Sequence, residues 1–260
     1  MRKILLIPST FTGEKKDKKI RIFLISQVAR AAINFGINEI GVYYDPDPKF
    51  DSHGLGRYIV KILKYLNTPP YLRKIAFPLD KELKEIGTAL PIVAKYHYDR
   101  EKYEYVYVIK KENNKYLVTN GEEKFWVENK RKLRNTKILI YDKENKELLH
   151  AYETKEYFGY EVFYYNKPID SLLKKLKKGG FYLIGTSRLG EDIRKIKIEK
   201  KEKIAIAFGS FARGFEDIYE NWKDLFDITI NTIPNQILKT IRTEEAIFYT
   251  LSILRYLNII

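Results

Sequence analysis

The sequence predicts an α/β protein in which a small antiparallel β-barrel interrupts one domain built on a parallel sheet. Buried apolar runs alternate with stretches of helical apolar spacing in residues 1–93, and the same alternation returns in residues 169–260. Residues 94–168 instead contain short segments rich in β-branched and aromatic residues, with no helical pattern between them. We therefore expect a discontinuous α/β domain, formed by 1–93 and 169–260, with an inserted barrel over 94–168.

The first part of this domain contains two strands and two helices. The expected elements are a strand over 3–9, a helix over 20–35, a strand over 39–44 and a helix over 56–66. The strands are continuous apolar runs, as in the centre of a parallel sheet. Gly36 suits the end of the first helix, and Pro69 with Pro70 stops the second. The strand and helix alternation predicts a right-handed α/β unit.

The inserted segment contains five or six closely spaced strands. They are expected at 103–109, 115–120, 124–128, 137–142, 147–153 and 160–165. Polar turns separate several of them, for example Glu112-Asn113-Asn114 and Asn120-Gly121. Strands without intervening helices favour a small antiparallel barrel.

The α/β pattern returns at Ile169 and continues to the end of the chain. A helix is expected over 172–177, strands over 181–184, 203–208 and 226–233, and a last helix over 243–257. The last helix has Ala246, Ile247, Leu251 and Leu254 on one side. These elements predict that the second half completes the sheet begun by the first.

The composition favours a polyanionic partner and excludes thiol chemistry. The formal net charge is +14, from 48 Lys and Arg against 34 Asp and Glu, and clustered cations gain free energy by releasing counterions from phosphates. A Lys- and Glu-rich chain is equally typical of a heat-adapted organism. The absence of cysteine excludes disulfides and thiolate zinc sites and fits a reducing, cytoplasmic setting. The N-terminal apolar run is too short for a signal peptide or a membrane span.

Three predicted strands of the second half end in loops that carry Gly, Ser or Asn. The loops are IGTSRLG (184–190), FGSFARG (208–214) and NTIPNQ (231–236). Ligands bind beyond the carboxyl ends of parallel strands, so adjacent loops of this kind predict one site, although glycine after a strand is also ordinary in loops. No Gly-x-Gly-x-x-Gly, Walker-type Gly-Lys-Ser, His-Glu-x-x-His or Gly-x-Ser-x-Gly occurs. Dinucleotide, metal and acyl-transfer sites are therefore disfavoured, and no metal is expected.

The segments IAFGSFARGFEDI and NTIPNQILKTIRTEEAIFYTLSILRYLN resemble motifs of the SPOUT class of RNA methyltransferases. More narrowly, they resemble the archaeal and eukaryotic branch that carries an OB-like barrel inserted in the knot domain. The segments LLIPSTF, VARAAINFGINEIGVYYD and LKYLNTPPYLRKIAFPL support the resemblance. It covers most of residues 1–92 and 178–260, whereas the barrel matches by position and strand content. The junction PIVAKYH (91–97) departs from the pattern of relatives, so the target nucleotide could differ.

The resemblance implies a trefoil-knotted parallel sheet and a bound S-adenosylmethionine held by the knot loops. It places the cofactor against Thr186, Ser187, Gly209, Gly214, Ile233, Pro234, Gln236, Thr243 and Glu245. Glycine suits such a cradle because the backbone can then approach the ligand closely. The resemblance also implies a homodimer, with each active site completed near the partner.

Three charged residues are candidates for catalysis. Arg30 occupies a position where related knot enzymes have an arginine that acts on RNA or on the nucleophile, although a solvated helix charge is the alternative. Arg242 and Glu244 lie beside the third loop, and Thr243-Glu244-Glu245 also reads as an ordinary acidic helix N-terminus. Methyl transfer to a base nitrogen such as uridine N3 requires removal of its proton. We expect Glu244 to be that general base.

The barrel is the expected RNA reader. OB-type sheets stack bases on exposed aromatics inside a basic groove. The candidates for RNA binding are Trp126, Lys130, Arg131, Lys132 and Arg134, and the same segment offers Tyr103, Tyr105, Tyr107 and Phe125. Because side chains alternate along a strand, about half of these aromatics belong to the core.

The sequence thus predicts an S-adenosylmethionine-dependent RNA methyltransferase that acts on ribosomal RNA, with uridine N3 as the target that the resemblance suggests. The alternative is an RNA-binding assembly factor that keeps the knot fold without catalysis. Binding of the cofactor separates the two. The net charge and the barrel disfavour an enzyme that acts on a protein.

Overall fold

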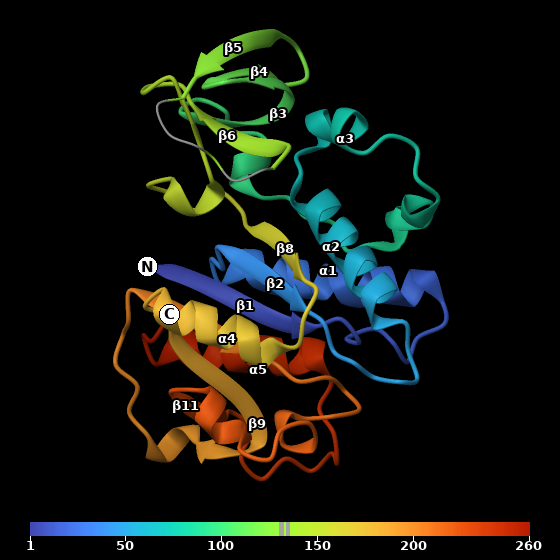
Figure 1. Ribbon diagram of the computed structural model, residues 1–260, viewed down its shortest axis with the longest axis vertical. Coiled ribbons are helices and arrows are strands. Elements are labelled where there is room, and N and C mark those ends of the chain that lie inside the picture. Colours follow the sequence, from blue (N-terminus) through green and yellow to red (C-terminus); the bar gives the residue numbers. More distant parts are fainter. Residues whose placement is uncertain (130–132, 134–135) are drawn as a thin grey trace.

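A six-stranded parallel sheet forms the centre of the computed structural model, which describes residues 1–129, 133 and 136–260 (Figure 1). Its strand order is β11-β9-β10-β1-β2-β8, and every neighbouring pair is parallel. The strands are β1 (Arg2–Pro8), β2 (Glu39–Tyr43), β8 (Glu161–Tyr165), β9 (Tyr182–Asp192), β10 (Lys203–Ala207) and β11 (Ile228–Asn231). The expected fold class is confirmed, while the trefoil knot stays a prediction.

Helices cover both faces of this sheet. They are α1 (Lys18–Asn34), α2 (Ser52–Asn67), α4 (Ile169–Lys178) and α5 (Thr243–Tyr256), whereas the short helix α3 (Pro70–Ala76) packs against the inserted sheet. Leu5 and Ile7 of β1 share a buried cluster with α1, α2 and α5, whereas Ile4 and Leu6 pack with α4. Since successive side chains of a strand point to opposite faces, β1 contributes to two cores and reads as a continuous apolar run.

The inserted segment forms a five-stranded antiparallel sheet with the order β5-β4-β3-β6-β7. Its strands are β3 (Tyr103–Glu112), β4 (Lys115–Thr119), β5 (Lys124–Glu128), β6 (Ile138–Asp142) and β7 (Glu147–Leu149). The side chain of Asn129, directly after β5, donates to the Leu148 carbonyl at 3.3 Å and accepts from the Leu148 N–H at 2.9 Å. This amide links the two edge strands, so the sheet curls toward a barrel.

One expected barrel strand belongs to the large sheet instead. The segment over 160–165 was expected in the insertion, but β8 pairs in parallel with β2, with Glu39 opposite Glu161. An edge strand with alternating polar and aromatic residues looks the same in either sheet, because periodicity identifies a strand but not its neighbour. The division into domains at 93 and 169 stays a prediction.

Two further elements of the structure, α3 and the end of β9, differ from the expected secondary structure. Helix α2 ends at Asn67, before Pro69 and Pro70 as expected, but a further short helix, α3, begins at Pro70, because proline is well suited to the first position of a helix. Strand β9 continues to Asp192, well beyond the expected end at Ile184. None of the helices within the described ranges is long and apolar enough to span a bilayer.

Candidate functional site

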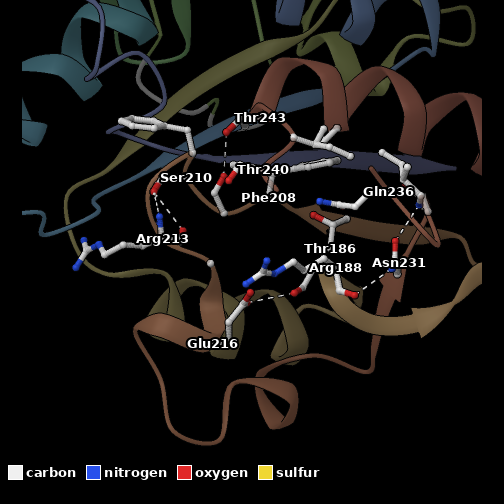
Figure 2. Close-up of a pocket in the computed structure, with 18 of the residues that line it drawn as sticks. Thr186, Arg188, Phe208, Ser210, Arg213, Glu216, Asn231, Gln236, Thr240 and Thr243 are labelled. Carbon is white, nitrogen blue, oxygen red and sulfur yellow. Dashed lines mark hydrogen bonds between the residues drawn. The ribbon is translucent and has the colours of Figure 1, made fainter. Parts of the chain in front are cut away.

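A pocket of about 340 Å³ lies beyond the carboxyl ends of the strands in the second half of the chain (Figure 2). Three segments and one helix end form its walls: the part of β9 beyond its pairing with β10, the loop after β10, the loop after β11, and the first turns of α5. Its volume lies in the range of ligand sites, roughly 300–1,000 Å³. The three loops that were expected to meet therefore line one pocket.

The loop after β10 is held at both of its ends. The Phe208 carbonyl accepts a hydrogen bond from the buried Tyr43 hydroxyl at 2.7 Å. The Ser210 N–H donates to the Arg213 carbonyl at 3.1 Å, and the Arg213 N–H donates to the Ser210 hydroxyl oxygen at 3.0 Å. A Cβ atom on Gly209 would lie 3.2 Å from the Arg213 carbonyl oxygen. The loop is therefore a tight backbone turn with no side chain at Gly209.

A buried ion pair anchors this loop to the first half of the chain. Nη2 of Arg213 lies 2.6 Å from Oδ1 of Asp45, and Nε lies 3.5 Å from Oδ2 of Asp47. Asp45, only 1% exposed, also accepts from the Thr10 hydroxyl, and its N–H donates to Ser9. Figure 2 shows the Arg213 side chain directed away from the pocket. Arg213 thus fixes the position of the loop, while its backbone lines the pocket.

The other two loops are fixed by short-range hydrogen bonds. The Thr186 hydroxyl donates to the Ala207 carbonyl at 2.9 Å, which ties β9 to β10 beyond their shared ladder. The Asn231 amide donates to the Arg188 carbonyl at 3.0 Å and accepts from the Ile233 N–H at 2.9 Å. Asn231 therefore joins the loop after β11 to β9, across the pocket from the loop after β10.

The N-terminus of α5 closes the pocket. The Thr243 hydroxyl donates to the Gly209 carbonyl at 3.0 Å, so the helix contacts the loop after β10 directly. The Glu245 carboxylate accepts from the Arg242 N–H at 2.9 Å and caps the helix. The Arg242 guanidinium forms an ion pair with Glu14. The predicted catalytic arginine is thus held beside the segment that follows β1.

Glu244 is a buried carboxylate at this helix end. The residue is 6% exposed, and burial raises the pKa of its carboxyl above the ordinary value of 4.5. The charges of Arg242 and Lys15 oppose that shift. A raised pKa brings a carboxyl closer to the range in which it exchanges protons with a substrate.

Most of the predicted cofactor residues meet in the pocket. Its walls include Thr186, Ser187, Gly209, Gly214, Ile233, Gln236 and Thr243. Pro234 does not line it, and Glu245 caps α5 and lines a neighbouring hollow instead. Sequence reasoning missed further lining residues: Phe208, Ser210, Phe211, Arg213, Asn231, Lys239, Thr240, Ile241, Ala246 and Thr250. Several of them lie inside the three quoted loops, which is the signal that identifies them.

The predicted catalytic residues do not line the pocket wall. Arg242 and Glu244 adjoin Thr243, which does. Arg30 lies on α1, is exposed, and donates a hydrogen bond to the Pro91 carbonyl. This contact ties α1 to the entrance of the insertion.

The predicted RNA-binding residues lie in the insertion. Trp126 on β5 is exposed (49%), whereas Tyr103 and Tyr105 are buried core residues. Lys130, Arg131, Lys132 and Arg134 lie outside the described residues. Across the ranges that the structure describes, no cluster of three His, Asp or Glu side chains is placed to hold a metal ion.

Comparison with known proteins identifies a family. The sequence model of the family described as "Putative RNA methyltransferase" matches residues 3–254. A 28S rRNA (uridine-N(3))-methyltransferase of Drosophila melanogaster is 27% identical over 96% of this chain and 61% of its own length. The human protein of the same name is 26% identical over 96% of this chain and 76% of its own length. The chain thus spans less than two thirds of the fly relative.

Solved structures resemble this chain at a lower sequence identity than these relatives do. The crystal structure of an RNA 2′-O ribose methyltransferase aligns with 99% of this chain and 57% of its own, at 10% identity and a TM-score of 0.44.

Proposed function

Because the chain belongs to this family of RNA methyltransferases, of the SPOUT class that its sequence resembles, we propose that it transfers a methyl group from S-adenosylmethionine to ribosomal RNA. The observation that carries the proposal is the pocket of about 340 Å³ formed by the three loops and the start of α5. It lies where parallel α/β sheets place their ligands, beyond the carboxyl ends of the strands.

The residues of the pocket fit this cofactor. At Gly209 a Cβ would crowd the backbone of Arg213 and Gly214, so this loop presents bare backbone to a ligand. The hydroxyls of Thr186 and Thr243 already donate to backbone carbonyls, and they hold the walls in place. We assign cofactor binding to the seven predicted residues that line the pocket, with Pro234 and Glu245 supporting them from outside. S-adenosylmethionine supplies an electrophilic methyl group on a sulfonium.

Glu244 is proposed as the general base and Arg242 as its electrostatic partner. If the acceptor is uridine N3, the N3 proton must leave as the nitrogen attacks the methyl carbon, and a carboxylate beside the pocket can accept it. The positive charge of Arg242 favours the anionic forms of both the carboxylate and the uridine base. Arg30 is proposed to contact RNA at the entrance of the insertion. Holding the nucleophile in line with the methyl group supplies most of the rate.

We expect the Glu244→Gln variant to lose about 10²- to 10⁴-fold in the rate of methyl transfer. In the parent, the rate should rise as pH increases through the pKa of Glu244, above 4.5, because the base must be deprotonated. Because the pKa of the Glu244 carboxyl is higher in the folded than in the unfolded state, protonation of Glu244 stabilises the fold. The contribution of Glu244 to folding stability is therefore present below pH 4.5 and is lost as pH rises through the folded pKa.

The matched control for this prediction is Glu245→Gln. That carboxylate caps α5, so its loss should cost about 1 kcal/mol of stability. Because the charge of Glu245 helps to raise the pKa of Glu244, the rate of this variant should still rise with pH, with the rise displaced to lower pH. Single-turnover rates from pH 4 to about 9 measure both variants. An unchanged profile in Glu244→Gln would remove Glu244 as the base.

Ribosomal RNA is proposed as the substrate, and uridine N3 as the methylated atom, because of the activity for which the relatives are named. Two relatives that align with 96% of this chain are named for uridine-N(3) methylation of 28S rRNA. The net charge of +14 supports a polyanionic substrate. The exposed Trp126 supports the insertion as the RNA reader, together with the basic residues that follow β5.

A second copy of the chain is proposed to cover an apolar patch beside the pocket. Ile237 (97% exposed) and Leu238 (64%) project from the loop after β11, next to Tyr249 on α5. They border a hollow of about 420 Å³ that shares Ile233 and other residues with the cofactor pocket. A partner seated here would complete the wall of the cofactor site, as the resemblance implies for a homodimer.

We expect Leu238→Asp to convert a dimer into a monomer and to weaken cofactor binding, because a charge would be buried in an apolar interface. Sedimentation equilibrium measures the change in mass. The matched control is Leu79→Asp, which changes a fully exposed leucine away from the patch and should leave the dimer intact. A monomeric parent would contradict the proposal.

Calorimetric titration with S-adenosylmethionine and S-adenosylhomocysteine tests the proposed function. We expect saturable binding of both. An absence of binding, with and without RNA, would favour the assembly factor that keeps the fold without catalysis.

A further inference from the structure

A second polar pocket lies at the N-terminus of α2, and none of its residues belongs to the wall of the cofactor pocket. Its volume is about 420 Å³. Its polar lining comprises Lys18, Arg21, Lys49, Asp51, Tyr58 and Glu82. The N-terminus of α2 is already capped by the Asp51 carboxylate, so the feature of the pocket that is suited to an anion is its three cations.

Tyr58 provides independent evidence for a ligand. The residue is 6% exposed, and its hydroxyl has no hydrogen-bond partner among the described residues. A buried hydroxyl without a partner costs free energy, and native proteins satisfy nearly all such groups. Burial raises the pKa of Tyr58 to about 12, so the hydroxyl keeps its proton and is available as a hydrogen-bond donor to an anion.

The charges around this hydroxyl favour an acceptor that is anionic. Within the described ranges, no carboxylate lies within ion-pair distance of Lys18, Arg21 or Lys49. The two carboxylates of the pocket are engaged elsewhere. Glu82 pairs with Lys61, and Asp51 caps α2 by accepting from the Gly54 N–H at 3.0 Å. The pocket therefore contains three cations without an acidic partner.

Two chains of contacts join this pocket to the cofactor site. Phe50, which lines it, makes an edge contact with Phe211 of the cofactor pocket, with ring centroids 6.2 Å apart. Separately, Nε of Arg21 donates to the Lys15 carbonyl, and the adjacent Glu14 pairs with Arg242. The two pockets therefore lie close enough for one RNA strand to contact both.

We propose that the pocket at the N-terminus of α2 binds a backbone phosphate of the substrate RNA and holds the strand beside the cofactor pocket. The identification of the polymer as RNA rests on the proposed function. A phosphate offers only acceptor oxygens, and Lys, Arg and a tyrosine hydroxyl are donors that match it. The Tyr58 hydroxyl is covered in the free protein, so contact with a phosphate oxygen requires lining side chains to move aside when the ligand binds. Such a contact positions the strand without reading its sequence.

The Tyr58→Phe variant tests the proposal. We expect its affinity for a fluorescently labelled oligouridylate to be about tenfold lower than that of the parent, as for loss of a hydrogen bond to a charged group. Its stability should be equal or higher, because the removed hydroxyl has no partner in the free protein. The matched control is Tyr98→Phe, at an exposed tyrosine, which should change neither property. Fluorescence anisotropy and chemical denaturation measure the two quantities.

A charge variant provides a second measurement. We expect Lys49→Gln to reduce the slope of log K against log salt by about 0.7, the value for one phosphate contact on a single strand. Lys197→Gln, at an exposed lysine after β9, is the control with the same change in charge. An unchanged slope and unchanged Tyr58→Phe affinity would overturn the proposal, as would a parent that binds no oligouridylate.

Two further measurements distinguish RNA binding at this pocket from binding of free phosphate and from binding of the cofactor. If Tyr58→Phe loses only the binding of inorganic phosphate and keeps its RNA affinity, the pocket is a site for free phosphate and the proposal is wrong. Titration with S-adenosylhomocysteine should be unchanged in Tyr58→Phe, because Tyr58 does not line the cofactor pocket. Failure of the cofactor titration in the parent would contradict the proposed function, while the RNA measurements would still decide the role of this pocket.

Discussion

Replacement of Gly209 by arginine is expected to abolish cofactor binding while the fold persists. The position faces the pocket, and a Cβ there already lies 3.2 Å from the Arg213 carbonyl and 3.3 Å from the Gly214 Cα. An arginine side chain here would both displace the tight turn of the loop after β10 and crowd the pocket that Gly209 lines. We expect the affinity for S-adenosylhomocysteine to fall by more than about a hundredfold, measured by calorimetry.

The control is Gly87→Arg. At Gly87 a Cβ would meet nothing within 4 Å, so the same change of residue should leave binding intact. The milder Gly209→Ala variant requires its neighbours to move by only a few tenths of an ångström, and we expect a smaller loss. Circular dichroism and thermal unfolding verify that the variants fold. Full binding by Gly209→Arg would place the cofactor elsewhere.

Removal of the buried Asp45 carboxylate is expected to destabilise the fold by about 2 kcal/mol, as for loss of a hydrogen bond to a charged group, because the Arg213 side chain is partly exposed. In Asp45→Ala, the Arg213 guanidinium keeps only its longer contact to Asp47, and the Thr10 hydroxyl loses its acceptor. The loop after β10 then loses its anchor on the first half of the chain. We therefore expect cofactor affinity to fall together with stability.

Denaturant unfolding and calorimetry measure these two effects. Glu202→Ala is the control, because Glu202 is 96% exposed and its contact with the N-terminal amine is 3.9 Å long. An exposed ion pair of this kind contributes less than about 0.5 kcal/mol. An Asp45→Ala variant as stable as the parent would show that the network does not hold the loop.

The apolar periodicity of the sequence was sufficient to predict the strands and helices that form the core of the fold. Strand β1 reads as a buried strand because both of its faces pack against helices, and α5 reads as a helix because Ile247, Leu251 and Leu254 recur on its buried side. The partner of β8 could not be predicted. Pairing with β2 depends on the path of the whole insertion, which no local pattern encodes.

The site was predictable to the extent that it consists of loops after strands. Glycines and short polar residues in 184–190, which form the second half of β9 rather than the expected loop, and in the loops after β10 and β11 indicated a shared pocket, and these three segments do meet. The ion pair between Arg213 and Asp45 joins residues 168 positions apart, so no spacing in the sequence could reveal it. Glu245 was expected at the cofactor, but its carboxylate caps α5, a role that the acidic helix start also allowed.

Transfer of a labelled methyl group shows whether the protein methylates ribosomal RNA at uridine N3. Unmodified large-subunit ribosomal RNA is incubated with the protein and S-adenosylmethionine that carries an isotopically labelled methyl group, and the nucleosides are then separated and identified by mass spectrometry. We expect labelled 3-methyluridine with the parent and none with Gly209→Arg. Unlabelled RNA from a parent protein that binds S-adenosylhomocysteine would contradict this prediction.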